Sequence, residues 1–203
     1  MRPRRRARIK DPTFWILARA SGVLAYLLLT ASVLVGLLLR TRIFGRLARP
    51  ALVTDIHRFL ALLGLGAIAI HGAALALDAA VPIPVRALFV PGIAPYRPLF
   101  TGMGVVAGEL ALLIYLSFPL RRLIGAKAWR KLHYATYLVF VSATIHGIAT
   151  GTDTGRPWML VVYGGAVALV VAATAYRFAV PSRRAAPKPS RREPGSPLSL
   201  GER

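Results

Sequence analysis

Five long apolar stretches run through this chain, and short basic or proline-rich segments separate them. The stretches cover residues 14–39, 53–77, 100–120, 130–149 and 158–176. A helix gains about 1.5 Å per residue, so about 20 apolar residues cross the ~30 Å hydrocarbon core of a bilayer. Helices also satisfy their own backbone hydrogen bonds there. The pattern therefore predicts an all-α, polytopic transmembrane helical bundle of about five spans.

The segments around these stretches divide the chain into three parts. Residues 1–13 form a basic N-terminal segment, residues 14–177 the transmembrane domain, and residues 178–203 a basic, proline-rich tail that we expect to be disordered. Residues 79–98 contain five prolines, which exclude another continuous crossing and favour a structured loop. The first stretch is too long for a signal peptide, and we expect it to remain as a span.

Composition and charge narrow the function classes. Hydrophobic residues make up 56% of the 203 residues, and the formal net charge is +20. The basic residues lie mostly between or beyond the spans, where they contact anionic lipid and set orientation. We therefore expect membrane lipid, and no nucleic acid, as a partner. The chain has no cysteine, which excludes disulfides, thiolate metal sites and thiol catalysis.

The loop charges also predict an orientation. If five helices alternate, nine basic residues fall in the loops of one side and three in the loops of the other. The three are Arg86, Arg97 and Arg156. The positive-inside rule then places the nine-residue side and the C-terminus in the cytoplasm. The basic cluster Arg4-Arg5-Arg6 argues for the opposite orientation, and we give the loops more weight.

Four histidines lie on two of the predicted spans. His57 and His71 are fourteen residues apart, and His133 and His146 are thirteen apart. A lone histidine in an apolar helix is most often a hydrogen-bonded core residue. Four on two spans at near-equal intervals indicate more, because ionisable groups in a membrane are costly and usually mark function. Each interval corresponds to roughly 20 Å of helix, most of the hydrocarbon core.

These intervals favour two haems at two depths. Haem iron that only passes electrons takes two axial imidazoles and keeps no open position for oxygen. If the second and fourth spans run parallel, His57 and His133 hold an inner haem, and His71 and His146 hold an outer one. A fourteen-residue step returns a helix to within about 40° of the same face, whereas a thirteen-residue step leaves about 140°. We therefore expect the fourth span to be overwound, kinked or bulged, or its haem planes to be rotated.

Cationic side chains near these depths are candidates for contacts to the haem propionates. They are Arg58, Arg130 and Lys131 near the inner pair and Arg97 near the outer pair. A lipid-headgroup or topology role fits each of them equally well. We predict no catalytic side chain.

Two stretches carry a resemblance. The first runs Leu116-Ser-Phe-Pro-Leu-Arg-Arg-Leu-Ile-Gly, then Trp129-Arg-Lys-Leu-His133-Tyr-x-x-Tyr, then His146, and the second is Asp55-Ile-His57-Arg-Phe with His71 downstream. They resemble the ferric reductase-like transmembrane domain over about residues 14–177. That superfamily includes ferric reductases, NADPH oxidases and the haem-binding subunit of the periplasmic methionine sulfoxide reductase system. The resemblance implies two b-type haems on the four histidines and electron flow outward from the cytoplasm.

The sequence departs from the superfamily in two respects. We expect one N-terminal helix fewer than many members have, and no flavin and nicotinamide domain in this chain. The resemblance then implies a separate donor, either quinol or a flavoprotein. We expect the membrane electron-transfer subunit of an oxidoreductase, in the plasma membrane, with an extracytoplasmic acceptor. The alternative is a haem-free transporter or channel whose histidines bind a metal ion or relay protons.

Overall fold

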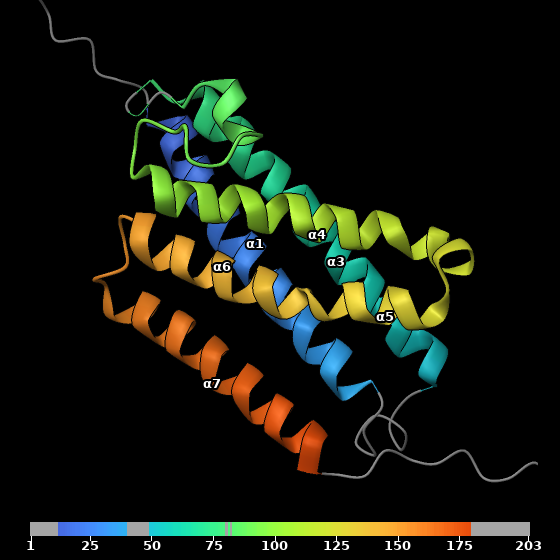
Figure 1. The fold of residues 1–203 in the computed structure, drawn as a ribbon. Coiled ribbons are helices and arrows are strands. Elements are labelled where there is room, and N and C mark those ends of the chain that lie inside the picture. Colours follow the sequence, from blue (N-terminus) through green and yellow to red (C-terminus); the bar gives the residue numbers. More distant parts are fainter. Residues whose placement is uncertain (1–11, 40–48, 80, 82, 180–203) are drawn as a thin grey trace, which may run out of the picture.

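The computed structural model describes residues 12–39, 49–79, 81 and 83–179, shown as coloured ribbon in Figure 1. The expected disordered tail lies almost wholly outside the described residues, as does most of the basic N-terminal segment. The described part of the chain is helical and contains α1 (Thr13–Leu38), α3 (Pro50–Leu77), the 3₁₀ helix η1 (Val85–Leu88), α4 (Pro98–Ile124), α5 (Ala126–Tyr134), α6 (Thr136–Thr150) and α7 (Pro157–Ala179).

Five helical stretches are long and apolar enough to cross a membrane. They are α1, α3, α4 and α7, together with α5 and α6 taken as one stretch from Ala126 to Thr150. Their outward faces carry exposed leucines, such as Leu112, Leu113 and Leu116 of α4. The all-α class and the five candidate spans are therefore confirmed.

Helix boundaries follow local sequence signals. Pro50, Pro98 and Pro157 each occupy the first position of a helix, where the missing N–H costs nothing because it would have no intrahelical partner. Gly125 separates α4 from α5 with a φ of 82°, a left-handed value that glycine adopts without steric cost. The chain therefore turns sharply there and places α5 back against α4.

The spans form two antiparallel pairs. α1 packs along α3, and α4 packs along α6, while α7 covers a face of α1 (Figure 1). Hydrogen bonds fix the direction of the first pair, because Ala18 of α1 meets His71 and Ser32 meets His57. The helices α3 and α6 are not among the closely packed pairs over their described lengths. Side chains of α3 and α6 therefore reach toward each other across the space between the two pairs.

The two ends of the bundle are built differently. At one end, η1 and its flanking loop bury Ile83, Ala87 and Ala94 in a small apolar cluster. Gly102 of α4 lets the loop approach closely, since a Cβ there would lie 2.8 Å from the Gly92 nitrogen. At the other end, α4 passes through Gly125 into α5. We call these the η1 end and the α5 end.

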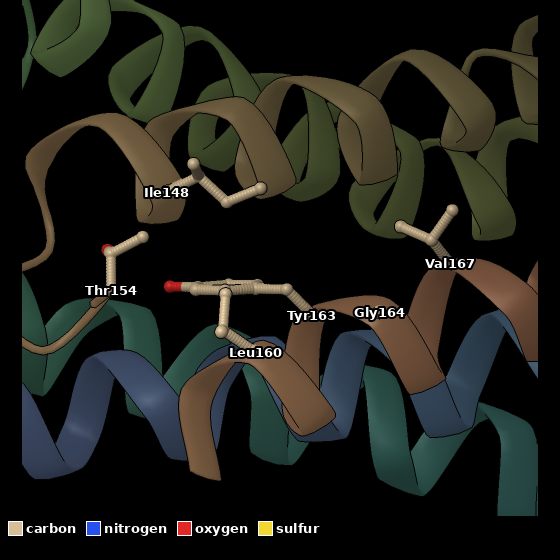
Figure 2. Close-up of a pocket in the computed structure, with 6 residues that line it drawn as sticks. All are labelled: Ile148, Thr154, Leu160, Tyr163, Gly164 and Val167. Carbon is tan, nitrogen blue, oxygen red and sulfur yellow. The ribbon is translucent and has the colours of Figure 1, made fainter. Parts of the chain in front are cut away.

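An aromatic cluster joins α7 to the rest of the bundle. The Tyr26 ring stacks on Phe140 and meets Tyr163 edge-on at a centroid distance of 5.1 Å, and its hydroxyl bonds to Thr144. Beside Tyr163, a cavity of about 320 Å³ opens between α6 and α7, with Ile148, Thr154, Leu160, Gly164 and Val167 as its other lining residues (Figure 2). This lining has no metal ligand or charged group, so the cavity is not the candidate site.

Candidate functional site

The structure brings the four histidines together as two facing pairs. His57 lies beside His133 at the α5 end, with ring centroids 6.0 Å apart and planes at 77°. His71 lies beside His146 at the η1 end, with centroids 6.3 Å apart and planes at 84°. These are the two combinations that the sequence spacing predicts. The parallel course of α3 and α6 produces them.

Backbone carbonyl groups hold three of the four rings through Nδ1. The donor–acceptor distances are 2.9 Å from His57 to the Ser32 carbonyl, 2.7 Å from His71 to the Ala18 carbonyl and 2.9 Å from His146 to the Phe100 carbonyl. A carbonyl oxygen only accepts, so Nδ1 carries the proton in all three rings. Their Nε2 atoms are then the basic nitrogens, the form in which a neutral imidazole binds a metal.

His133 is held in another way. Its Nδ1 is buried and has no hydrogen-bond partner in the described part of the structure. Its ring instead stacks on Trp129, one helical turn earlier in α5, with centroids 5.0 Å apart and planes at 22°. The Trp129 indole N–H donates to the Ser117 hydroxyl of α4, which donates to the Ile114 carbonyl. This ligand candidate is therefore supported by side chains rather than by a direct bond to backbone.

The geometry of both pairs fits a metal centre between two imidazoles. A metal lies about 2 Å from each ligating imidazole nitrogen, which places the two ring centroids about 6 Å apart. Both measured separations agree with this value. The described residues contain no group of three or more His, Cys, Asp or Glu that could hold a metal ion. Two protein ligands per site suit haem iron, whose porphyrin supplies the other ligands.

The predicted distortion of the fourth span is present. The stretch divides at Ala135, between α5 and α6. The Ala135 N–H bonds to the Leu132 carbonyl, three residues back rather than four, at 3.0 Å. Such a tightened turn adds rotation per residue, which offsets part of the mismatch of a thirteen-residue step. His133 and His146 both face α3, where they pair with His57 and His71.

The predicted propionate partners occupy different surroundings. The Arg58 guanidinium lies 4.7 Å from the centre of the Phe118 ring, and Arg121 lies 4.4 Å from the same ring. Arg130 and Lys131 are exposed on α5. Arg97 adopts a left-handed φ of 42° before α4 and donates to the Ala149 carbonyl at the end of α6. Arg97 thus ties two helices together at the η1 end.

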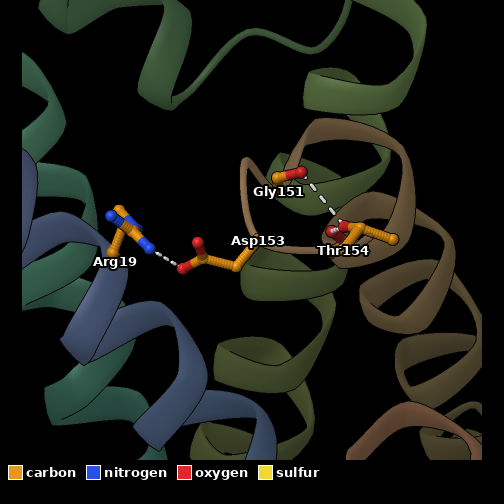
Figure 3. Close-up of polar contacts among 5 residues, drawn as sticks. Arg19, Gly151, Asp153 and Thr154 are labelled. Carbon is orange, nitrogen blue, oxygen red and sulfur yellow. Dashed lines mark hydrogen bonds and ion pairs between the residues drawn. The ribbon is translucent and has the colours of Figure 1, made fainter. Parts of the chain in front are cut away.

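An ion pair adds a second tie at the η1 end. Arg19 of α1 pairs with Asp153 in the loop between α6 and α7 (Figure 3). Its guanidinium also lies 4.1 Å from the Trp15 ring centre. Within the same loop, the Thr154 hydroxyl donates to the Gly151 carbonyl. Arg19 directly follows Ala18, whose carbonyl holds His71. The pair therefore fixes the part of α1 that supports the η1-end histidines.

Sequence reasoning missed the supports behind the histidines. Gly22 and Gly36 of α1 lie against the rings of His71 and His57. They are fourteen residues apart, as the two histidines are, and this equal spacing could have indicated the contact. Trp129 and His133 are four residues apart and so share a helix face. The pairing of Arg19 with Asp153 had no local signal, because the two residues lie far apart along the chain.

Comparison with known proteins assigns the chain to a family. A family model described as a domain of unknown function (DUF8596) matches residues 13–153. The chain belongs to this family. The matched range contains all four histidines and stops before α7. No curated protein and no solved structure matched the chain.

Proposed function

We propose that the protein is a membrane electron-transfer subunit that carries two b-type haems, one between His57 and His133 and one between His71 and His146. A single observation carries the proposal. Two histidine pairs face each other between parallel helices, with ring separations of 6.0 and 6.3 Å that suit a shared metal. A proton relay or an ion pathway does not require this separation to recur at two depths.

The chain has three tasks in this function. Its backbone carbonyls orient the imidazoles so that Nε2 is free. Its apolar helices exclude water and lower the local dielectric constant, which tunes the potentials. Its spacing sets the two sites roughly 20 Å apart along the helices. When bound, six-coordinate haem takes up and releases single electrons without an open position for oxygen.

The proposed direction runs from the α5 end to the η1 end. Arg121, Arg122, Lys127, Arg130 and Lys131 all lie near the α5 end, which favours the cytoplasm for this end. The donor is then quinol or a separate flavoprotein on the cytoplasmic side of the cell membrane. The acceptor lies outside, as in a ferric reductase-like system, and the chain is the membrane subunit of that oxidoreductase.

The first test is a reduced-minus-oxidised difference spectrum of the purified protein, expressed with added haem and quantified per chain. We expect two b-type haems per chain. The matched control is His146→Leu, which keeps an apolar side chain in the helix and should leave one haem. A haem-free wild-type protein that is folded and inserted would overturn the proposal and favour the transporter alternative. One haem per chain would remove one of the two sites.

The second test concerns direction. Proteoliposomes with the α5 end outward should pass electrons from an external impermeant reductant to ferricyanide trapped inside. Orientation is assigned by protease access to the tail. Transfer that requires the opposite orientation would show that the cytoplasmic assignment is wrong.

A further inference from the structure

Three of the four histidines rest on the same backbone arrangement. In each case the carbonyl that accepts Nδ1–H is followed four residues later by a glycine, and a Cβ on that glycine would meet the histidine ring. The combinations are Ala18 with Gly22 for His71, Ser32 with Gly36 for His57, and Phe100 with Gly104 for His146. We call this arrangement a carbonyl–glycine seat.

Helix geometry explains why the glycine lies at this spacing. The carbonyl of residue i already accepts the N–H of residue i+4 and has a second lone pair for another donor. Each Cβ tilts toward the helix N-terminus, so the side chain at i+4 covers that carbonyl. Glycine uncovers the carbonyl, and an imidazole from a neighbouring helix can then approach it edge-on.

The seats follow the spacing of the ligands. Gly22 and Gly36 are fourteen residues apart on α1, which runs antiparallel to α3, so they match the fourteen residues between His57 and His71. One helix therefore holds both histidines of α3 in the same way. Since their Nδ1 atoms are occupied, both rings present Nε2 away from α1.

The fourth seat is replaced. Fourteen residues after Phe100 and Gly104, α4 carries Ile114 and Phe118 instead. The Ile114 carbonyl accepts from the Ser117 hydroxyl, Ser117 accepts from Trp129, and Trp129 stacks on His133. The carbonyl at the equivalent position thus supports this histidine through two side chains.

We propose that Gly22, Gly36 and Gly104 are positioning residues for three haem-ligating histidines, and that Trp129 has this role for His133. This inference rests on the proposed function and identifies what holds each ligand in place. It predicts that substitutions act on one haem site each: Gly22 and Gly104 on the η1-end site, Gly36 and Trp129 on the α5-end site.

The collision distances rank the glycine substitutions. A Cβ at Gly104 would lie 2.5 Å from the His146 Nδ1, one at Gly22 would lie 2.9 Å from the His71 Nδ1, and one at Gly36 would lie 3.1 Å from the His57 Cε1. Gly66 is the matched control, because it is helical and a Cβ there would meet nothing within 4 Å. The expected order of effect is Gly104→Ala, then Gly22→Ala, then Gly36→Ala, with Gly66→Ala unchanged.

The experiment measures haem retention at one site at a time. His133→Leu leaves only the η1-end haem for the Gly22 and Gly104 variants, and His146→Leu leaves only the α5-end haem for the Gly36 and Trp129 variants. Transfer of haem to an excess of apomyoglobin and the low-spin signal in electron paramagnetic resonance report each site. Loss of such supporting contacts weakens metal binding by about 10- to 100-fold, and we expect this range for Gly104→Ala.

Variants of Trp129 test the inference without changing a glycine. Trp129→Phe keeps an aromatic ring against His133 but removes the bond to Ser117, so it should lose haem more slowly than Trp129→Leu, which should lose it about tenfold faster than the wild type. If the wild-type protein binds two haems but the seat variants match Gly66→Ala, or Trp129→Leu matches Trp129→Phe, the inference is overturned while the proposed function stands. A wild-type protein without haem overturns both. Gel filtration, together with the haem of the other site when the same substitution is made in the wild-type background, shows that each variant is folded.

Discussion

The two histidine pairs use the same ligand type but different supports. At the η1 end, backbone carbonyls hold both rings, at 2.7 Å for His71 and 2.9 Å for His146. At the α5 end, a carbonyl holds His57 and an aromatic side chain holds His133. A helix carbonyl is fixed by the helix itself, whereas a stacked indole depends on side-chain contacts. The backbone therefore sets both rings at the η1 end. At the α5 end, the position of His133 depends on a side chain, which a substitution can change.

The contacts that join neighbouring helices also differ between the η1 end and the α5 end. At the η1 end, the Arg19–Asp153 ion pair and the bond from Arg97 to the Ala149 carbonyl join different helices and a loop. At the α5 end, Arg177 of α7 donates to the Leu37 carbonyl of α1, but this bond does not involve α3, α4 or α6. Among the described residues, an ion pair and a charged hydrogen bond therefore join elements around the η1-end pair, whereas around the α5-end pair Trp129 bonds to Ser117 and Arg58 lies over Phe118.

The largest effects are expected when the histidines of each pair are replaced in turn. His71→Ala and His146→Ala should each lower the haem content from two per chain to one, because losing one of the two axial imidazoles weakens haem binding at that site. The remaining α5-end haem should still be reduced by a donor at that end. His57→Ala and His133→Ala should spare the η1-end haem but prevent its reduction from the α5 end.

Haem content by the pyridine haemochrome and reduction by stopped flow measure this prediction. Loss of both haems from any one variant that still elutes as a folded protein would show that the sites are not independent. In that case the separation into two ends has no functional meaning.

The sequence was sufficient for the features that depend on local pattern. Apolar length alone predicted five spans, and the interval between His57 and His71 placed both on one helix face. The thirteen residues between His133 and His146 predicted either a distortion of this span or rotated haem planes, and a distortion lies at Ala135. Each of these conclusions uses residues within one helix and the fixed geometry of that helix.

The supports behind the histidines depend on packing between helices. Gly22 and Gly36 repeat the fourteen-residue interval of the histidines, but their contacts are defined only once α1 packs against α3 in the register that brings Gly22 to His71. The Arg19–Asp153 pair likewise needs the loop after α6 to fold over the start of α1. Haem itself stays a prediction from ligand type, spacing and resemblance.

A smaller effect should follow from weakening the η1-end ties. Asp153→Asn keeps the shape of the side chain but leaves the partly buried Arg19 without its charged partner. Loss of one partner of a buried polar interaction costs about 1–3 kcal/mol, and about 2–4 °C of melting temperature is expected per kcal/mol for a chain of this size. The matched control is Asp55→Asn, an exposed acid near the α5 end, which should melt like the wild type.

Thermal unfolding in detergent, followed by circular dichroism, measures this difference. The variant should also release the η1-end haem before the α5-end haem on heating. Equal melting of the two variants would mean that the ion pair contributes nothing to the η1 end, and the contrast in ties would then rest on Arg97 alone.

The smallest expected effect concerns Ser32 at the α5 end, where backbone and side chain act on the same ring. The Ser32 hydroxyl lies 3.2 Å from the His57 Nδ1, which already donates to the Ser32 carbonyl at 2.9 Å. Ser32→Ala removes this longer, shared contact and the 3.4 Å hydrogen bond from the Ser32 hydroxyl to the His57 carbonyl. A neutral hydrogen bond contributes about 0.5–1.5 kcal/mol, and the low end corresponds to about a twofold faster loss of haem.

Ser21→Ala is the control for this substitution. Ser21 also lies on α1 and donates to the Leu17 and Ala18 carbonyls of its own helix, next to the η1-end site that the His146→Leu background has already emptied. In the His146→Leu background, the Ser32 and Ser21 variants should differ by no more than this factor in haem transfer to apomyoglobin. A tenfold or larger loss for Ser32→Ala would mean that the hydroxyl, not the carbonyl, holds His57. Side chains would then hold both histidines at the α5 end, and the contrast with the η1 end would be complete rather than partial.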